Sequence, residues 1–283
     1  MSSNISILIL TKNEEHDISG CLDSVSWSDD IHVYDSMSAD STVEIAKQFG
    51  AVVTQREYGD ELAFGGDEAA HRNWGLKNIK FKYEWVFIID ADERMTPYLI
   101  KNIQLLLASP TKHVAFSVQR RDFFMGVWLK HVQTSPFYMR LVRPEKMHYE
   151  RLINPVLIAD GTVGQVDGFL DHYPFSKGVD YWVERHNSYS KFEAQQIVAN
   201  RKNNTPFSLV KAFIEKDFHR KRFHQKELFY RLPFRPFVKF LILYFGKKGF
   251  LDGRAGFTYA ILQSIYEYFI VLKTHELEQK ENK

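Results

Sequence analysis

The stretch that most constrains the fold of this chain is EWVFIIDADER, residues 84–94. Its five apolar residues, 85–89, end abruptly in Asp90 and Asp92. A short apolar run bounded by polar residues predicts a buried strand. Two unneutralised carboxylates at the end of that strand would repel each other, so a bound cation would explain their presence. Mg²⁺ and Mn²⁺ prefer oxygen ligands and often share them with substrate phosphates, and either ion fits the pair.

The first hundred residues alternate between short apolar runs and helical patterns. Strands are predicted at 5–10, 30–35, 51–55 and 85–89, and helices from Glu14 onward, within 38–50, over 67–78 and within 96–109. This alternation predicts a parallel sheet wrapped by helices. Ligands of such sheets bind beyond the carboxyl ends of the strands. Thr11, Asp35 and Asp90 all lie at predicted carboxyl ends, so three loops are expected to converge on one edge.

The chain beyond residue 110 has a different pattern. Mixed strands and loops are expected up to a long helix from about Asp180 to Asn200, and a basic, aromatic stretch follows at 201–235. In the segment 254–273, apolar residues recur at spacings of 4, 4, 3 and 4: Phe257, Ile261, Ile265, Tyr268 and Leu272. Gln263 and Glu267 interrupt this segment, so it is amphipathic. Such a helix can lie in a bilayer interface or pack as a core helix, and the sequence leaves both open.

Charge is distributed unevenly along the chain, although the formal net charge is only +2. Residues 1–100 carry 18 Asp and Glu against 8 Lys and Arg, a balance of −10. Residues 201–250 carry 13 Lys and Arg against 3 Asp and Glu, a balance of +10. The acidic part suits a metal, and the basic part suits the phosphates of nucleic acid, anionic lipid or a lipid-linked diphosphate. Nucleic acid is the weakest of these, because no recognisable nucleic-acid-binding module accompanies the charge.

The compartment is indicated by what the sequence lacks. Cys21 is the single cysteine, so no disulfide forms within the chain and multi-cysteine zinc clusters are excluded. The apolar run at 5–10 is too short for the core of a signal peptide, and no run of about 18 apolar residues marks a membrane span. We therefore expect a cytoplasmic protein.

Seven motifs span nearly the whole chain: ILTKNEE (9–15), DSMSADST (35–42), RNWGL (72–76), DADE (90–93), FYMRLVR (137–143), LDHY (170–173) and KGFLDGRAGF (248–257). Together they resemble the family 2 glycosyltransferases, which are inverting enzymes of the GT-A fold. The resemblance is greatest to the bacterial branch that builds lipopolysaccharide core or other surface polysaccharide. It implies a GT-A catalytic domain over 1–200, with a nucleotide-binding half to about residue 110 and an acceptor half at 111–200. A basic amphipathic helical extension over 201–283 would follow.

The resemblance also implies which residues bind the donor. In such enzymes the first loop and the aspartate after the second strand hold the base and ribose of the nucleotide, here Thr11, Asn13, Glu14 and Asp35. The basic residue of the helix before the D-x-D motif lies near the nucleotide and its phosphates, which assigns Arg72. The second aspartate of D-x-D binds Mn²⁺ or Mg²⁺ on the donor diphosphate, which assigns Asp92, and Asp90 contacts the ribose or the metal. Helix capping for Asp35 and a surface ion pair for Arg72 are the alternatives without function.

An inverting transfer needs a base that takes the proton of the acceptor hydroxyl. In relatives this base is an Asp or a Glu on the acceptor side. The segment HYERLINPV (148–156) resembles a family pattern with a Glu and, after three further residues, a His-Glu pair. Glu150 matches the first Glu and is the predicted base, although Asn154-Pro155 replaces the pair. Asp122 and Asp167 are the alternatives.

Further side chains are candidates for the acceptor side of the site: Arg140, Arg143, Trp128, His131 and His172. The arginines suit the oxygens of an acceptor phosphate, because a guanidinium fork matches phosphate geometry. Trp128 and His131 are expected to line the acceptor site, since the face of a tryptophan suits a sugar, with core or surface packing as an equal alternative for both. His172 is a metal ligand, an acceptor contact or a structural histidine.

These observations predict a metal-dependent inverting glycosyltransferase. It would move a sugar from a nucleotide-sugar donor, a UDP-sugar, to a glycolipid or other lipid-linked saccharide. Its basic C-terminal region would dock on the anionic cytoplasmic face of the inner membrane. A catalytically silent membrane-binding scaffold of the same fold is the alternative from another class. A sugar nucleotidyltransferase fits less well, because the loop after the first strand contains no glycine.

Overall fold

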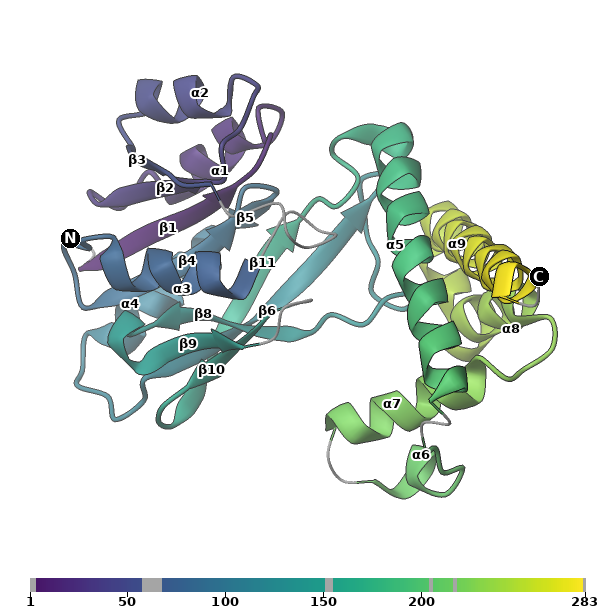
Figure 1. The fold of residues 1–283 in the computed structure, drawn as a ribbon. Helices are drawn as coiled ribbons and strands as arrows, with labels where there is room; N and C mark the ends of the chain where they lie inside the picture. Colours follow the sequence, from purple (N-terminus) through teal and green to yellow (C-terminus); the bar gives the residue numbers. More distant parts are fainter. Residues whose placement is uncertain (1–3, 58–67, 151–154, 204–205, 216–217, 282–283) are drawn as a thin grey trace. The chain divides into compact units, whose positions relative to one another are not determined.

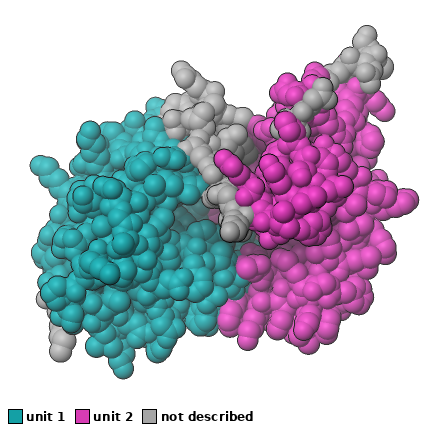
Figure 2. All heavy atoms as spheres, turned by 90° about the horizontal axis from the view of Figure 1, so that it is seen from below, with its two compact units in different colours: residues 1–123, 135–176 teal, residues 124–134, 177–283 magenta. Residues whose placement is uncertain are grey.

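The computed structural model describes residues 4–57, 68–150, 155–203, 206–215 and 218–281 of the 283-residue chain. The chain forms two compact units, residues 1–123 with 135–176 and residues 124–134 with 177–283 (Figure 2). The domain boundary expected near residue 200 falls inside helix α5 (Gly178–Lys202). This helix belongs to the second unit because it packs along another helix of that unit, α9 (Gly253–Glu281).

The first unit is built on a mixed sheet with the strand order β3-β2-β1-β4-β8-β6-β11-β5 (Figure 1). The strands are β1 (Ile5–Thr11), β2 (Ile31–Asp35), β3 (Val52–Gln55), β4 (Trp85–Asp90), β5 (Glu93–Met95), β6 (Ala115–Phe124), β8 (Phe137–Val142) and β11 (Val163–His172). Neighbours from β3 to β4 are parallel, as are β6 and β11, and the other neighbours are antiparallel. A 3₁₀ turn, η1 (Pro144–Lys146), leads into an antiparallel pair, β9 (Met147–Glu150) and β10 (Val156–Ala159).

Both faces of the parallel part of the sheet are covered. Helices α1 (Ile18–Val25), α2 (Thr42–Gln48) and α4 (Pro97–Leu107) pack on the face to which Ile5, Ile7 and Ile9 of β1 point. Helix α3 (Glu68–Asn78) and the β9–β10 pair pack on the other face, around Leu8. Successive side chains of a strand point to opposite faces, so a strand covered on both sides is a continuous apolar run in sequence. The predicted α/β layering is confirmed.

Parallel pairing brings the ends of three strands to one edge of the sheet. Thr11 in β1 lies opposite Asp35 in β2, and Leu10 lies opposite Asp90 in β4. The predicted convergence of the three loops is confirmed. Helix α1, however, begins at Ile18 rather than at Glu14, because the preceding residues form a loop that bonds to the next loop along the edge.

The turn that carries the D-x-D motif is held by Arg94. Its guanidinium donates hydrogen bonds to the carbonyl oxygens of Ala91 (2.8 Å), Glu93 (2.8 Å) and Asp17 (2.9 Å). Gly20 in α1 leaves room for this side chain, since a Cβ there would lie 2.6 Å from Arg94 Nε. The turn is therefore fixed from the side of α1.

The second unit consists mainly of helices. Its elements are β7 (Val127–Trp128), α5, α6 (Lys211–Ile214), α7 (Phe218–Phe229), α8 (Arg235–Leu241), a π-helical turn η2 (Ile242–Gly246), a 3₁₀ turn η3 (Gly249–Asp252) and α9. Helix α9 packs against α5 and α8. Within the described part of the chain, one helical stretch, Gly249–Lys280, is long and apolar enough to cross a membrane as judged by length and composition.

Candidate active site

Asp35 organises the edge of the sheet where β1 and β2 end. It is fully buried and accepts hydrogen bonds from Thr11 Oγ1 (2.8 Å), Gln55 Nε2 (3.1 Å) and both the hydroxyl and the backbone N–H of Ser38 (2.8 Å for the latter). Such a set of donors fixes the carboxylate and closes the loop after β2. The structure thus brings the predicted residues Thr11 and Asp35 into direct contact.

The loop after β1 is joined to the loop after β2 through Asn13. Its backbone N–H donates to Ser38 Oγ (2.8 Å), and its side-chain oxygen accepts from the N–H of Ala39 (2.9 Å). Asn13 has a φ of 55°, a left-handed conformation that asparagine tolerates better than most residues. The next N–H, of Glu14, donates to Thr42 Oγ1 (2.7 Å). Asn13 and Glu14 therefore lie on the same edge as Thr11 and Asp35.

Asp90 ends β4 beside a buried arginine from β8. One guanidinium nitrogen of Arg140 lies 2.9 Å from Asp90 Oδ2 and 2.5 Å from Glu93 Oε1. Burial by itself would raise the pKa of Asp90, but the charges of Arg140 and Arg72 hold it well below its usual range. Burial raises the pKa of Glu93, whose side chain is completely enclosed. Glu93 stands in the DADE motif, but the sequence did not reveal that its side chain is enclosed beside Arg140.

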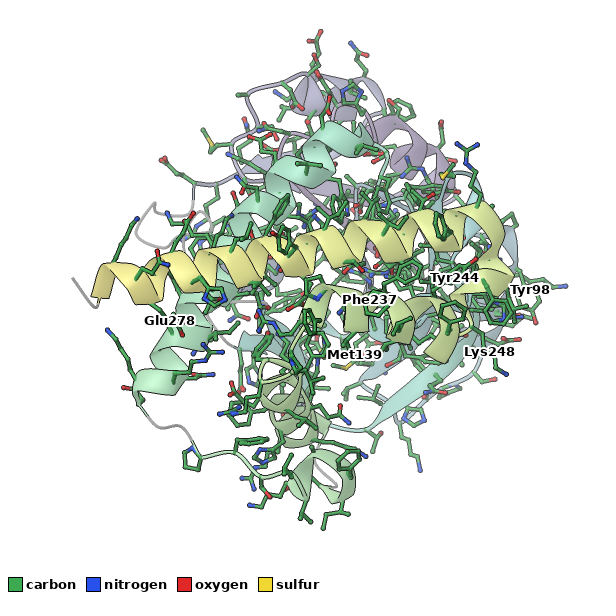
Figure 3. All side chains as sticks on the ribbon, turned by 90° about the vertical axis from the view of Figure 1, so that its right-hand side faces the viewer. Tyr98, Met139, Phe237, Tyr244, Lys248 and Glu278 are labelled. Carbon is green, nitrogen blue, oxygen red and sulfur yellow. The ribbon has the colours of Figure 1, made fainter. Side chains whose placement is uncertain are left out.

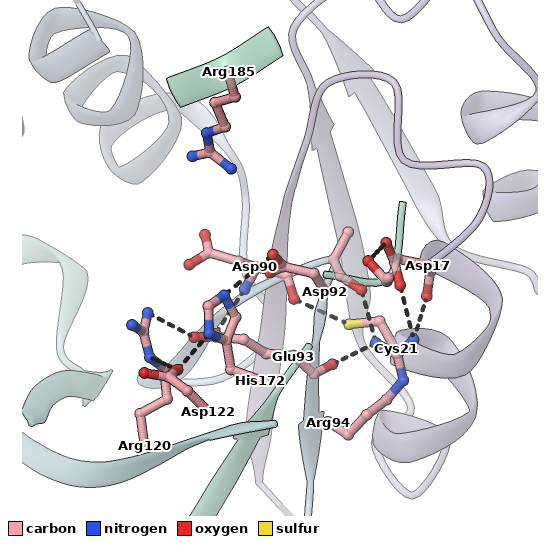
Figure 4. A network of polar contacts seen from close by, with 12 residues as sticks. Asp17, Cys21, Asp90, Asp92, Glu93, Arg94, Arg120, Asp122, His172 and Arg185 are labelled. Carbon is pink, nitrogen blue, oxygen red and sulfur yellow. Dashed lines mark hydrogen bonds and ion pairs between the residues drawn. The ribbon is translucent and has the colours of Figure 1, made fainter. Parts of the chain in front are cut away.

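Asp92 belongs to a chain of three side chains (Figure 4). His172 Nε2 lies 3.2 Å from Asp92 Oδ2, and His172 Nδ1 lies 2.5 Å from Asp122 Oδ1. Burial opposes a charged imidazole, but the hydrogen bonds to Asp122 and Asp92 raise the pKa of His172 to about 9. Burial likewise opposes the charge of Asp92, and the bond to His172 lowers its pKa. Asp122 is buried and is also contacted by Arg120 Nε at 3.0 Å.

Arg72 reaches the same place from α3. It pairs with Glu68 one turn earlier in the helix, at 2.5 Å, and its guanidinium lies 5.4 Å from the ring centre of Tyr149 in β9. The neighbouring residue, Asn73, binds both backbone groups of Tyr149, accepting from its N–H (2.6 Å) and donating to its carbonyl (2.9 Å). Helix α3 is thereby clamped to β9, and Arg72 is held facing Tyr149.

A pocket of about 460 Å³ adjoins Asp90. Its polar and aromatic lining comes from Arg72, Asp90, Ser117, Arg120, Phe137, Tyr138, Arg140 and Tyr149. Three guanidinium groups therefore border it against a single carboxylate. Arg120 and Tyr149 were not predicted from the sequence. Tyr149 had a signal, because it alternates with the polar His148 and Glu150 in β9, whereas Arg120 stands between Gln119 and Arg121 and had none.

Other predicted residues lie apart from this cluster. The side chain of Glu150 is 59% exposed and contacts His148 at 3.1 Å, whereas its neighbour Tyr149 faces inward. Asp167 accepts from the hydroxyl of Tyr98 at 2.7 Å, on the α4 side of the sheet. Arg143 pairs with Glu84 at the opposite end of β4 from Asp90.

The acceptor candidates Trp128 and His131 are part of the second unit. His131 Nδ1 lies 2.7 Å from Asp252 Oδ1, and its N–H donates to Asp252 Oδ2 at 2.9 Å. Lys130 lies over the ring of Trp128. Asn154 and the rest of 151–154 lie outside the described residues, so the departure from the His-Glu pair is known from sequence only.

The donor atoms around Asp92 suit a divalent cation. Within the described ranges there is no cluster of three or more His, Cys, Asp or Glu side chains arranged around a metal position. Asp92 and His172 nevertheless form a carboxylate–imidazole pair, and Asp122 bonds to the far nitrogen of the imidazole. An outer carboxylate of this kind fixes the tautomer and orientation of a metal-binding histidine.

The model of glycosyl transferase family 2 matches residues 6–172, which include the strands of the sheet described above except for Ile5 at the start of β1. The chain belongs to glycosyltransferase family 2. It is therefore a transferase with a role in glycosyl transfer, and the GT-A fold expected from the motifs is confirmed.

Relatives within the family are similar over almost the full length. The chain is 26% identical over 277 residues to the lipopolysaccharide core biosynthesis glycosyltransferase LpsC of Rhizobium meliloti, covering 96% of this chain and 92% of LpsC. It is 25% identical to an uncharacterized glycosyltransferase of Rickettsia typhi, covering 98% and 88%. Similarity to the lipopolysaccharide branch of the family is thus confirmed.

A solved structure also matches in part. Glucosyl-3-phosphoglycerate synthase of Mycobacterium tuberculosis, crystallised with Mn²⁺, UDP-glucose and phosphoglyceric acid, is 25% identical with a TM-score of 0.34. The match covers 41% of this chain and 43% of the synthase, which is less than half of either.

Proposed function

We propose that the protein is a metal-dependent inverting glycosyltransferase that uses a UDP-sugar donor. The observation that supports this most strongly is the cluster at the end of β4, where Asp90 and Asp92 meet Arg140 and His172 within hydrogen-bond distance. A carboxylate pair with cationic side chains around it is what a metal-bound diphosphate requires. If these two acids were absent or pointed away from the cluster, the catalytically silent scaffold would have been the better interpretation.

Asp92 and the Nε2 atom of His172 would hold the cation, with Asp90 beside them, and His172 would release its Nε2 proton when the cation binds. Two or three protein ligands leave positions that the diphosphate of the donor would fill, as is common for Mg²⁺ and Mn²⁺. An imidazole in the donor set favours Mn²⁺ over Mg²⁺, because Mg²⁺ is bound almost entirely through oxygen. When bound, the cation would offset the negative charge of the departing diphosphate.

The arginines of the pocket would act on the same leaving group. Arg72 and Arg140 flank Asp90, and their charges lower its pKa. Arg140 is bonded to the enclosed Glu93, whereas Arg72 pairs with Glu68, whose side chain is 37% exposed. Fixed positive charge that faces the developing diphosphate stabilises the transition state without reorganisation of water. Thr11, Asn13, Glu14 and Asp35 would hold the base and ribose along the adjoining edge.

Glu150 remains our candidate for the base. Asp122 is buried and engaged by His172, so it is not accessible to an acceptor hydroxyl, and Asp167 lies on the α4 side of the sheet, where Tyr98 donates to it. Glu150 follows Tyr149, which lines the pocket, and its carboxylate is accessible. It would take the proton of the acceptor hydroxyl as that oxygen attacks the anomeric carbon.

The acceptor would be a saccharide of the lipopolysaccharide type or another lipid-linked saccharide in bacterial surface-glycan synthesis. The support is the similarity to LpsC over 96% of the chain. The enzyme would work at the cytoplasmic face of the inner membrane, attracted to anionic lipid by its basic C-terminal region. Arg143, Trp128 and His131 stay predicted acceptor residues. Membrane attachment of this kind weakens as salt is added.

Nucleotide binding tests the donor site. Thermal unfolding is measured with UDP, GDP, CMP and TDP, each with and without Mn²⁺. A ligand at about 100 times its Kd stabilises the fold by roughly 2.7 kcal/mol. We expect stabilisation by UDP that requires Mn²⁺ and is lost in Asp92→Asn. The matched control, Asp29→Asn, removes an exposed aspartate paired with Lys82 and should keep the shift.

The role of Glu150 needs a separate measurement. Glu150→Gln should abolish sugar transfer while the Mn²⁺-dependent stabilisation by UDP is unchanged. Near-normal turnover in this variant would remove Glu150 from the mechanism. A protein that shows no stabilisation with any nucleotide would contradict the proposed donor site.

A further inference from the structure

The amphipathic stripe of α9 faces outward rather than into the protein. Four of its five residues are exposed by more than 40%: Phe257, Ile265, Tyr268 and Leu272. The inner face of α9, packed on α5 and α8, carries Ala260, Glu267, Ile270 and Thr274, all of which are buried. The helix thus turns most of its apolar stripe to the surface, while its inner face carries two polar side chains, Glu267 and Thr274, beside Ala260 and Ile270. This arrangement is opposite to that of an ordinary core helix.

Neighbouring elements of the second unit extend the apolar surface. Along 232–251 the exposed apolar side chains are Leu232, Phe234, Phe237, Leu241, Ile242, Phe245, Phe250 and Leu251. Phe234 and Phe237 line the same hollow as Tyr268 and Val271 of α9, a space of about 810 Å³. At the other end, the ring of Tyr244 contacts the rings of Phe245, Phe250 and Phe257. We call the eight exposed apolar side chains of 232–251 and the four exposed residues of α9 the apolar face.

Figure 3 shows this side of the second unit. Helix α9 crosses the view, and Phe237, Tyr244 and Lys248 lie beside it along α8 and the turns that follow. The exposed fraction of Phe234 is 82%, and its backbone is left-handed with a φ of 52°. A phenylalanine held this far into solvent loses the benefit of burial unless a partner covers it.

The exposed charge along residues 231–275 has one sign, and the exposed carboxylate of Glu276 lies just beyond this stretch. Between Arg231 and His275 the chain carries seven lysines and arginines and only two carboxylates, Asp252 and Glu267. Both carboxylates are buried, Asp252 by its bonds to the 131–132 backbone. Exposed cations, by contrast, include Lys247, Lys248 and Arg254. Any partner therefore meets apolar side chains and positive charge with no exposed carboxylate along this stretch.

An ion pair holds α9 to the helix beneath it. Glu267 in the middle of α9 and Arg235 at the start of α8 are 4% and 5% exposed, and Arg235 Nε lies 3.3 Å from Glu267 Oε1. Further along α9, Lys273 Nζ donates to Asn187 Oδ1 and to Ser190 Oγ of α5, both at 2.7 Å. Moving α9 into a bilayer as a spanning helix would strip these charged groups of their partners, which is costly.

We propose that the apolar face inserts into the interfacial layer of an anionic bilayer, with α9 lying parallel to the membrane plane. The inference rests on the proposed function and deepens it, because it adds a hydrophobic attachment to the electrostatic one. Positive charge beside exposed aromatic residues is the combination that binds anionic lipid, with the cations at the headgroups and the rings below them. In this orientation the apolar side chains of α9 insert into the bilayer along one side of the helix, and the helix does not cross the membrane.

Flotation with lipid vesicles tests attachment. The full chain is mixed with vesicles of phosphatidylcholine, with or without phosphatidylglycerol, at low and high salt. We expect the initial binding to require phosphatidylglycerol. Once bound, a fraction of the protein should stay on the vesicles at high salt. A variant with Phe234, Phe237 and Phe245 replaced by Ser should lose at least about tenfold in partitioning, because three inserted aromatic anchors are removed.

A matched control separates insertion from general loss of apolar surface. Phe49, Tyr98 and Leu105 are also exposed apolar residues, but they lie on the first unit. Their replacement by Ser should leave flotation unchanged. Stabilisation by UDP with Mn²⁺ is measured in both variants and should be retained, so a failure of membrane insertion is distinguished from a failure of the donor site.

The orientation of α9 is tested by tryptophan quenching with brominated lipids. Phe257→Trp, Ile265→Trp and Leu272→Trp place a probe along about 22 Å of helix axis. A helix parallel to the membrane gives three probes at the same shallow depth. A spanning helix puts the probe at 265 deepest and would overturn the proposal.

Three other outcomes would also overturn it. Absence of quenching at all three positions would show that lipid does not cover this face. A dimer in light scattering that the three Ser substitutions dissociate, without any flotation, would assign the apolar face to a second copy of the chain. Flotation that high salt abolishes completely would leave only the electrostatic attachment and would refute insertion.

Discussion

Replacement of Arg140 by Met is the most direct test of the cluster at the end of β4. Arg140 is 7% exposed and its guanidinium lies 2.9 Å from Asp90 and 2.5 Å from Glu93. At an effective dielectric constant of about 20, unit charges 2.5 Å apart attract by roughly 7 kcal/mol. Desolvation of the buried groups offsets much of this. Removal of one partner, however, leaves the other buried and uncompensated, which costs about 3–5 kcal/mol.

We therefore expect Arg140→Met to lower the free energy of unfolding by about 3–5 kcal/mol. Urea unfolding of the full chain, followed by tryptophan fluorescence, measures the change, and Trp85 in β4 reports on the affected strand. The double variant Arg140→Met/Glu93→Gln should recover more than half of the loss, because the enclosed carboxylate is neutralised with its partner.

Arg143→Met is the matched control. Arg143 is the next arginine along the chain, but its partner Glu84 is 60% exposed, so its loss should cost less than about 1 kcal/mol. The reasoning is refuted if Arg140→Met is as mild as Arg143→Met. It is refuted equally if the double variant is less stable than Arg140→Met, since Glu93 would then not be the group left without compensation.

Three further predictions concern the supports of the site. Gly20→Ala should displace Arg94, destabilise the chain by about 1–3 kcal/mol and weaken Mn²⁺-dependent UDP binding, as measured by thermal unfolding. Asn73→Ala should cost about 2 kcal/mol and speed amide exchange at Tyr149, whereas Asn73→Asp, which keeps the acceptor, should recover part of the loss in the same exchange measurement. Burial and the Arg56 charge lower the pKa of His71 from 6.5 to about 4. The neutral His71 side chain therefore contributes fully to the free energy of unfolding above pH 6.5, and this contribution is lost as the pH falls to 4. Between pH 7 and pH 4, urea unfolding should show the wild type losing about 3 kcal/mol more than His71→Gln, and equal losses would contradict the assignment.

Local patterns in the sequence were sufficient for most of the fold. The run from Trp85 to Ile89 is apolar because β4 is covered on both faces, and a strand of that kind needs no alternation. Helix α4 lies within the range predicted at 96–109, and Thr96 Oγ1 accepts from the N–H of Leu99 as a cap does, directly before Pro97. Parallel pairing then made the convergence of Thr11, Asp35 and Asp90 a geometric consequence.

Local sequence patterns could not predict which side chains contact each other within the candidate site. Asp122 and His172 meet because β6 and β11 are neighbours in register, and 50 residues separate them in sequence. Arg140 and Glu93 are 47 residues apart. Only the order of strands in the sheet decides such contacts, and that order is fixed by packing of the whole unit.

By itself the sequence determined the strands, the helices, the edge where the D-x-D carboxylates lie and the family of the chain. Each of these depends on residues near one another along the chain, through the period of two in strands and of 3.6 in helices. Only the tertiary structure decided that Glu93 is enclosed beside Arg140 and that the apolar stripe of α9 faces outward. The stripe has the same helical period whichever way it points. What turns it outward is the buried Glu267–Arg235 pair, because a charge inside a protein must lie next to its partner.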